Sequence, residues 1–121
     1  MDLRITKPRK PEWLAQNLDN PFRGWDGAEH IPATAAKKAA NQYRKTRSQL
    51  MKLAAEPGED AQPQALDAVA AYTQTFNKMG FIETEERDEI YMALRDILDA
   101  LPGDMLQKDA LIAKFDELHD F

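Results

Sequence analysis

Residues 34–55 contain no glycine or proline and alternate apolar and polar positions with the period of an α-helix. At 100° per residue, the apolar positions fall on one side of such a helix and the lysines and arginines on the other. Thr34 is expected to be its N-cap. The pattern predicts a long amphipathic helix. Its apolar side would hold Ala35, Ala36, Ala39, Ala40, Tyr43, Leu50, Met51, Leu53 and Ala54.

Three further helical patterns follow, and turns with glycine or proline separate them. The second helix is expected over 63–79, ending before Gly80, which suits the position after a helix. The third is expected over 85–101, with acids in its first turn, where the helix dipole favours negative charge. The fourth is expected to begin at a capping residue, Asp104, with Gln107 as its capping-box partner.

The first 33 residues lack a long periodic pattern. A basic arm over 1–10 precedes a short helix expected over 12–18. Residues 21–32 begin and end with proline and contain two glycines, so they predict an irregular loop that carries two large aromatic residues.

No segment shows sustained alternation with period two, so strands are not expected. The chain is therefore expected to be all-α, an up-down bundle of three to four helices with a short N-terminal helix and an irregular aromatic loop. With 121 residues it fits a single domain. Within it, residues 1–33 would pack on the bundle formed by residues 34–121.

Composition narrows the classes of protein. The absence of cysteine excludes disulfides and thiolate metal sites. No stretch approaches the roughly 20 apolar residues of a membrane span, and no apolar segment follows the N-terminal bases as in a signal peptide. A soluble cytoplasmic protein is expected.

The charges are sorted along the chain, which makes the net charge of −5 misleading. Residues 1–33 are neutral, residues 34–55 carry six bases and no acid, and residues 56–121 carry sixteen acids and five bases. Two surfaces of opposite sign are therefore expected.

One of these surfaces is the polar side of the third helix. Its acids are Glu85, Asp88, Glu89, Asp96 and Asp99. Metal-binding bundles direct carboxylates inward and pair them with histidine, so this pattern indicates a solvated acidic face, and neither a metal nor a cofactor is expected. Met92 lies in the middle of this face, where a flexible apolar side chain would suit contact with a basic protein surface. The expected binding residues here are Asp88, Glu89, Met92 and Asp96.

The other surface is a basic stripe on the helix over 34–55. Its residues are Lys37, Lys38, Arg44, Lys45 and Lys52. Three interpretations stay open. The bases could be offset by acids of neighbouring helices, they could bind nucleic acid together with the N-terminal arm, or they could bind an acidic protein or a second copy of this chain.

The aromatic loop is a further candidate for partner binding through Arg23 and Trp25, since these residue types dominate interface hot spots. The alternative is that its aromatic rings close the end of the bundle. His30 could be oriented by Asp26 or Glu29 as a catalytic histidine, although a surface or capping histidine is the simpler interpretation. The last histidine, His119, suits the C-terminal end of a helix.

No constellation of nucleophile, base or phosphate loop is present. The sequence therefore predicts a small non-enzymatic interaction protein that binds a macromolecule, most simply a protein, through charged helical faces. Inhibitors of the immunity or anti-defence type from bacterial systems are one example, by analogy of size, acidity and helicity. The alternative is a nucleic-acid-binding protein that uses the basic stripe.

Overall fold

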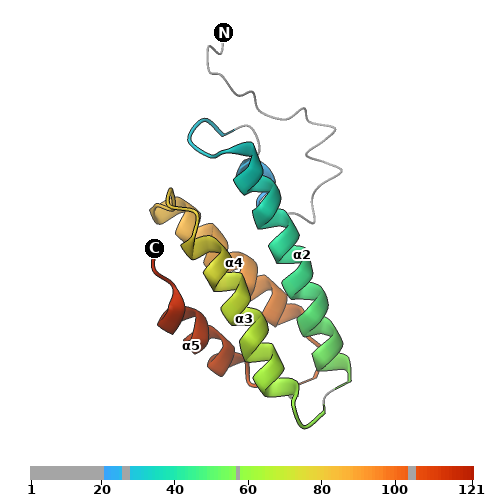
Figure 1. Ribbon diagram of the computed structural model, residues 1–121. Coiled ribbons are helices and arrows are strands. Elements are labelled where there is room, and N and C mark those ends of the chain that lie inside the picture. Colours follow the sequence, from blue (N-terminus) through green and yellow to red (C-terminus); the bar gives the residue numbers. More distant parts are fainter. Residues whose placement is uncertain (1–20, 26–27, 57, 104–105) are drawn as a thin grey trace.

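A computed structural model of the chain describes residues 21–25, 28–56, 58–103 and 106–121 (Figure 1). Its elements are the 3-10 helix η1 (Arg23–Trp25) and the α-helices α2 (Ala33–Ala55), α3 (Ala61–Asn77), α4 (Thr84–Ala100) and α5 (Lys108–Leu118). No strand occurs among the described residues, and the expected all-α bundle is confirmed. The helix expected over 12–18 and the arm over 1–10 lie outside the described residues.

Successive helices run in opposite directions (Figure 1). α2 and α3 form an antiparallel hairpin, α5 lies along the other side of α3, and α4 passes behind this layer and contacts α2. The Tyr72 hydroxyl joins α3 to α4 by donating a 2.6 Å hydrogen bond to the carbonyl oxygen of Ile90. Burial raises the pKa of Tyr72 well above its usual value, so the phenol remains a donor.

The core lies on the apolar sides that the periodicity predicts. α2 contributes mainly alanines, which allow neighbouring helices to approach closely, while α3, α4 and α5 supply larger side chains. The fully buried larger residues of these three helices are Val69, Tyr72, Phe76, Ile90, Leu94, Ile97, Leu98, Leu111 and Phe115.

Two expected N-caps are wrong, and α3 begins at Ala61 rather than at Pro63. α2 begins at Ala33 with Pro32 as its cap, because the Pro32 carbonyl already accepts the first helical hydrogen bonds, and Thr34 lies inside the first turn. α5 begins at Lys108 with Gln107 as its cap, well after the expected capping residue Asp104, which lies outside the described residues. The Gln62 amide of α3 accepts a 2.9 Å hydrogen bond from the Gln107 backbone N–H, which fixes the chain at this point.

The turn after α3 agrees with the prediction in part, since α3 ends at Asn77 rather than at Met79 but Gly80 makes the turn. Gly80 has φ +77°, in the left-handed region that favours glycine. The turn brings Phe81 back against Trp25, with 5.7 Å between ring centroids.

Candidate interaction surfaces

The outward side of α4 carries acids around an apolar side chain. Among the described residues, Met92 is the large hydrophobic residue that stands exposed, at 54%. Asp88 and Asp96 lie about one helical turn before and after it, and both are exposed. The opposite side of α4, with Ile90 and Leu94, is buried in the core. The carboxylates of Asp88 and Asp96 are therefore presented to solvent beside Met92.

Glu89 differs from these acids because it is only half exposed and is bonded to the loop. Its Oε1 accepts a 3.0 Å hydrogen bond from the indole Nε1 of Trp25. Burial raises the pKa of Glu89, the bond from Trp25 lowers it, and the nearby charges of Glu85 and Glu86 raise it further, with a net increase. The expectation that Glu89 is a freely solvated acid is therefore wrong.

Glu86 is a buried carboxylate that the sequence did not single out. Its Oε1 accepts a 3.1 Å hydrogen bond from the Glu83 N–H as part of a reciprocal capping box. Its Oε2 lies 3.2 Å from Nε2 of His30, which comes from the loop 56 residues earlier. The one sequence signal was that Glu86 lies four residues before Ile90, on the core side of α4.

His30 therefore contacts a different carboxylate from those expected. Of the two expected partners, Glu29 is an exposed neighbour in the loop, and Asp26 lies outside the described residues. Together with the Trp25–Glu89 bond, the His30–Glu86 contact fastens the loop to the first half of α4.

Trp25 is buried rather than available to a partner. It is 2% exposed, and its ring meets those of Phe22, Phe76 and Phe81 at centroid distances of 4.9, 6.1 and 5.7 Å. Its predicted role as a contact residue does not fit this burial, and the alternative, closure of the end of the bundle, does. The side chain of Arg23 lies outside what the structure describes.

The basic stripe of α2 faces solvent on the side opposite the buried alanines. All five of its expected residues are exposed: Lys37, Lys38, Arg44, Lys45 and Lys52. Between residues that the structure describes, the ion pairs are His30–Glu86 at 3.2 Å and Lys114–Glu117 at 3.7 Å, and neither joins α2 to α4. No ion pair between described residues of α2 and α4 therefore supports the interpretation that acids of neighbouring helices offset these bases.

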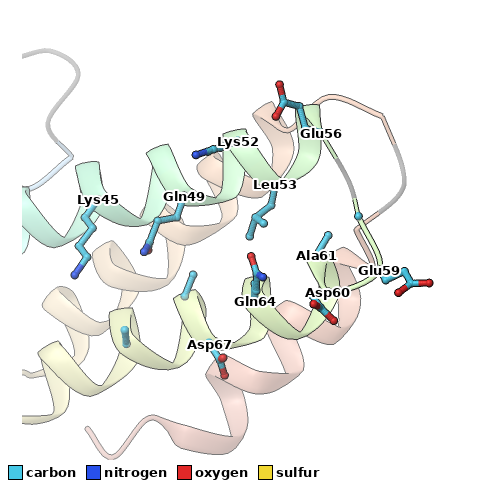
Figure 2. A pocket seen from close by; sticks show the side chains of 13 residues that line it. Lys45, Gln49, Lys52, Leu53, Glu56, Glu59, Asp60, Ala61, Gln64 and Asp67 are labelled. Carbon is cyan, nitrogen blue, oxygen red and sulfur yellow. The ribbon is translucent and has the colours of Figure 1, made fainter.

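A groove of about 680 Å³ lies between α2 and α3, next to the turn that joins them (Figure 2). In Figure 2, Lys45 and Leu53 point from α2 towards α3, and Gln64 points back towards α2. The α3 wall adds carboxylates and small apolar side chains. The residues that line the groove include Lys45, Lys52, Leu53, Asp60, Asp67 and Ala68. The sequence did not predict this groove, since it depends on which helices lie side by side.

The described ranges contain no group of three or more histidine, aspartate or glutamate side chains placed to hold a metal ion. Nor does any described helix have the length and apolar character needed to cross a lipid bilayer.

Comparisons of the chain with protein-family models, curated proteins and solved structures found no match. A functional proposal for this chain therefore depends on its own surfaces.

Proposed function

We propose that this chain is a non-enzymatic, cytoplasmic interaction protein whose outward α4 side binds another protein. The observation that carries the proposal is Met92, which is 54% exposed between two acids in a domain whose other large apolar side chains are at least partly buried within the described residues. An apolar residue at the centre of a polar surface gains free energy when a partner removes it from water.

The partner best suited to this surface is a protein with a basic patch around an apolar pocket. Asp88 and Asp96 would steer the encounter and set its orientation, while Met92 would adapt its flexible side chain to the pocket. A stoichiometric inhibitor of the immunity or anti-defence type would need no more than such a surface.

A pull-down from the native host tests the proposal with the double variant Asp88→Lys/Asp96→Lys. Glu89 is left unchanged because it accepts the hydrogen bond from the Trp25 indole. The matched control is Asp116→Lys/Asp120→Lys, which makes the same change at two exposed positions in and just after α5. We expect the α4 variant alone to lose the partner. Recovery of the same partner by both variants would exclude the outward side of α4 as the binding surface.

Nucleic-acid binding by α2 is a second candidate function, supported by the exposure of all five bases in the stripe. Phosphate contacts release counterions, so binding must weaken steeply as salt rises. Titration of a mixed-sequence duplex at several salt concentrations tests this candidate, with Lys37→Glu/Lys38→Glu as the variant expected to weaken binding about tenfold or more. Absence of binding at low salt would exclude it.

A further inference from the structure

We propose that the α2–α3 groove receives the outward side of α4 from a second copy of this chain, so that copies associate head to tail. The inference rests on the proposed role of α4 as a binding surface and names one partner for it. It is supported by two sets of opposite charges, the groove lysines with the α4 acids and the groove aspartates with the α4 arginines, and by an apolar side chain in each surface.

The first complementary pair involves the α2 wall of the groove. Lys45 and Lys52 are exposed and seven residues apart, so about 10 Å of helix axis separates them. On α4, Asp88 and Asp96 lie eight residues apart, about 12 Å, on one i, i+4 ridge with Met92 midway. Two lysines on long stems can reach two carboxylates at nearly the same spacing, while Met92 enters beside Leu53.

The opposite wall provides the second pair. Asp60 and Asp67 of the α3 side are exposed and also seven residues apart. The neighbouring i, i+4 ridge of α4 carries Arg87 and Arg95, which are exposed and eight residues apart. The Arg95 guanidinium donates a 3.0 Å hydrogen bond to the Tyr91 hydroxyl, which keeps it on that ridge. An incoming α4 thus presents acids to the lysine wall and arginines to the aspartate wall.

The centre of the groove suits the apolar part of this surface. Leu53 points from α2 towards α3 (Figure 2), Ala68 lines the α3 side, and the volume of about 680 Å³ exceeds that of one methionine side chain. The other acids of the rim, Glu56 and Glu59, lie at the turn and would meet the end of the incoming helix. The charges of Glu56 and Glu59 repel the acids of the incoming α4. This repulsion favours an orientation in which the arginines of α4 lie nearest to these two glutamates.

The two surfaces meet between copies rather than within one. In its own chain, α4 turns its apolar side to the core, so its outward side cannot reach the groove of the same molecule. Because groove and ridge are different surfaces, the contact is heterologous, and each copy keeps one free groove and one free α4. We therefore expect open chains that grow with concentration.

Sedimentation at low salt over a range of concentrations tests the proposal. We expect the mass of the wild-type chain to rise with concentration, and both Lys45→Glu/Lys52→Glu and Asp88→Lys/Asp96→Lys to weaken self-association about tenfold or more. Controls with the same charge changes elsewhere, Lys37→Glu/Lys38→Glu and Asp116→Lys/Asp120→Lys, should associate like wild type.

Mixing the two disruptive variants gives a sharper test. The mixture contains an intact groove on one chain and an intact α4 surface on the other, so we expect association to return. This result also excludes misfolding as the cause of the loss. A single-chain mass for the wild type at every concentration, equal loss in the controls, or no recovery on mixing would each overturn the proposal.

The groove variant also separates this inference from the proposed function. Lys45→Glu/Lys52→Glu leaves the α4 surface intact, so it should still capture a foreign partner that binds there. Capture of that partner by a wild-type chain that never self-associates would refute the head-to-tail contact and leave the proposed function standing.

Discussion

Two residues expected to contact a partner, Trp25 and Glu89, instead hold the loop and the bundle together. The sequence pattern assigns one to an aromatic loop and the other to an acidic face, whereas the hydrogen bond between them joins residues 64 positions apart. Local periodicity carries no information about such a distant pair. It did place Asp88 and Asp96 correctly on the exposed side of α4, because exposure along one helix follows from its own period.

Replacement of Trp25 should reveal its structural role. Trp25→Ala removes a 2%-exposed ring from the aromatic cluster, and we expect it to lower the free energy of unfolding by about 3–5 kcal/mol. Trp25→Phe keeps a ring but loses the N–H donor to Glu89, so its cost should be smaller, about 1–2 kcal/mol. Urea unfolding measures both changes. If Trp25→Ala unfolded like wild type, the ring would not be part of the core.

The raised pKa of Glu89 predicts how stability changes with pH. A carboxyl whose pKa is higher in the folded state binds more protons there than in the unfolded chain, so its contribution to stability falls as pH rises from its usual 4.5 through the raised value. Glu89→Gln keeps an oxygen acceptor for Trp25 and removes this titration. We therefore expect the variant to gain stability relative to wild type as pH rises across this range.

Thermal melting of both chains between about pH 4 and about pH 7 measures this difference. The rest of the sequence is identical in the two chains, so its contributions to the pH dependence largely cancel. A difference between the two melting temperatures that stays constant with pH would contradict the assignment.

At the scale of elements, the hydrophobic period predicts where helices run but not how they begin. Glu83 caps α4 through its reciprocal bonds with Glu86, and the start of α5 is delayed to Lys108, after Gln107, whose backbone N–H is bonded to Gln62 of α3. The delay depends on a contact across 45 residues, which the capping pattern at Asp104 cannot reveal. The left-handed turn after α3 was predictable from Gly80, although α3 ends at Asn77, two residues before the expected Met79.

Gly80 therefore provides a test of how much one turn contributes. Gly80→Ala forces a side chain into φ +77°, and we expect a loss of about 1–2 kcal/mol in the free energy of unfolding. Gly58→Ala is the matched control. It changes an exposed glycine whose φ lies outside the left-handed region, with no atom within 4 Å of the added carbon. Denaturant unfolding compares the two, and equal losses would show that the backbone conformation at Gly80 is not the cause.

At the scale of the molecule, the sorting of charge along the sequence becomes a basic side on α2 and an acidic side on α4. These sides could be predicted because each follows from one helix. The α2–α3 groove could not, since it arises only when the helices pair. The same packing places Lys45 and Lys52 in one groove with the acidic residues Asp60 and Asp67. The basic stripe therefore has one part that lines this groove and another part, with Lys37 and Lys38, that lies outside it.

Because the chain carries a net charge of −5, repulsion among like charges should dominate the response of stability to salt. In dilute protein, where association does not contribute, we expect added NaCl to raise the urea midpoint by about 0.3 M through screening of that repulsion. Asp88→Asn/Asp96→Asn removes two charges from the acidic side, so its midpoint should rise less. If bases and acids instead stabilised the fold by pairing across helices, salt would lower the wild-type midpoint, and the wild type would lose more than the variant.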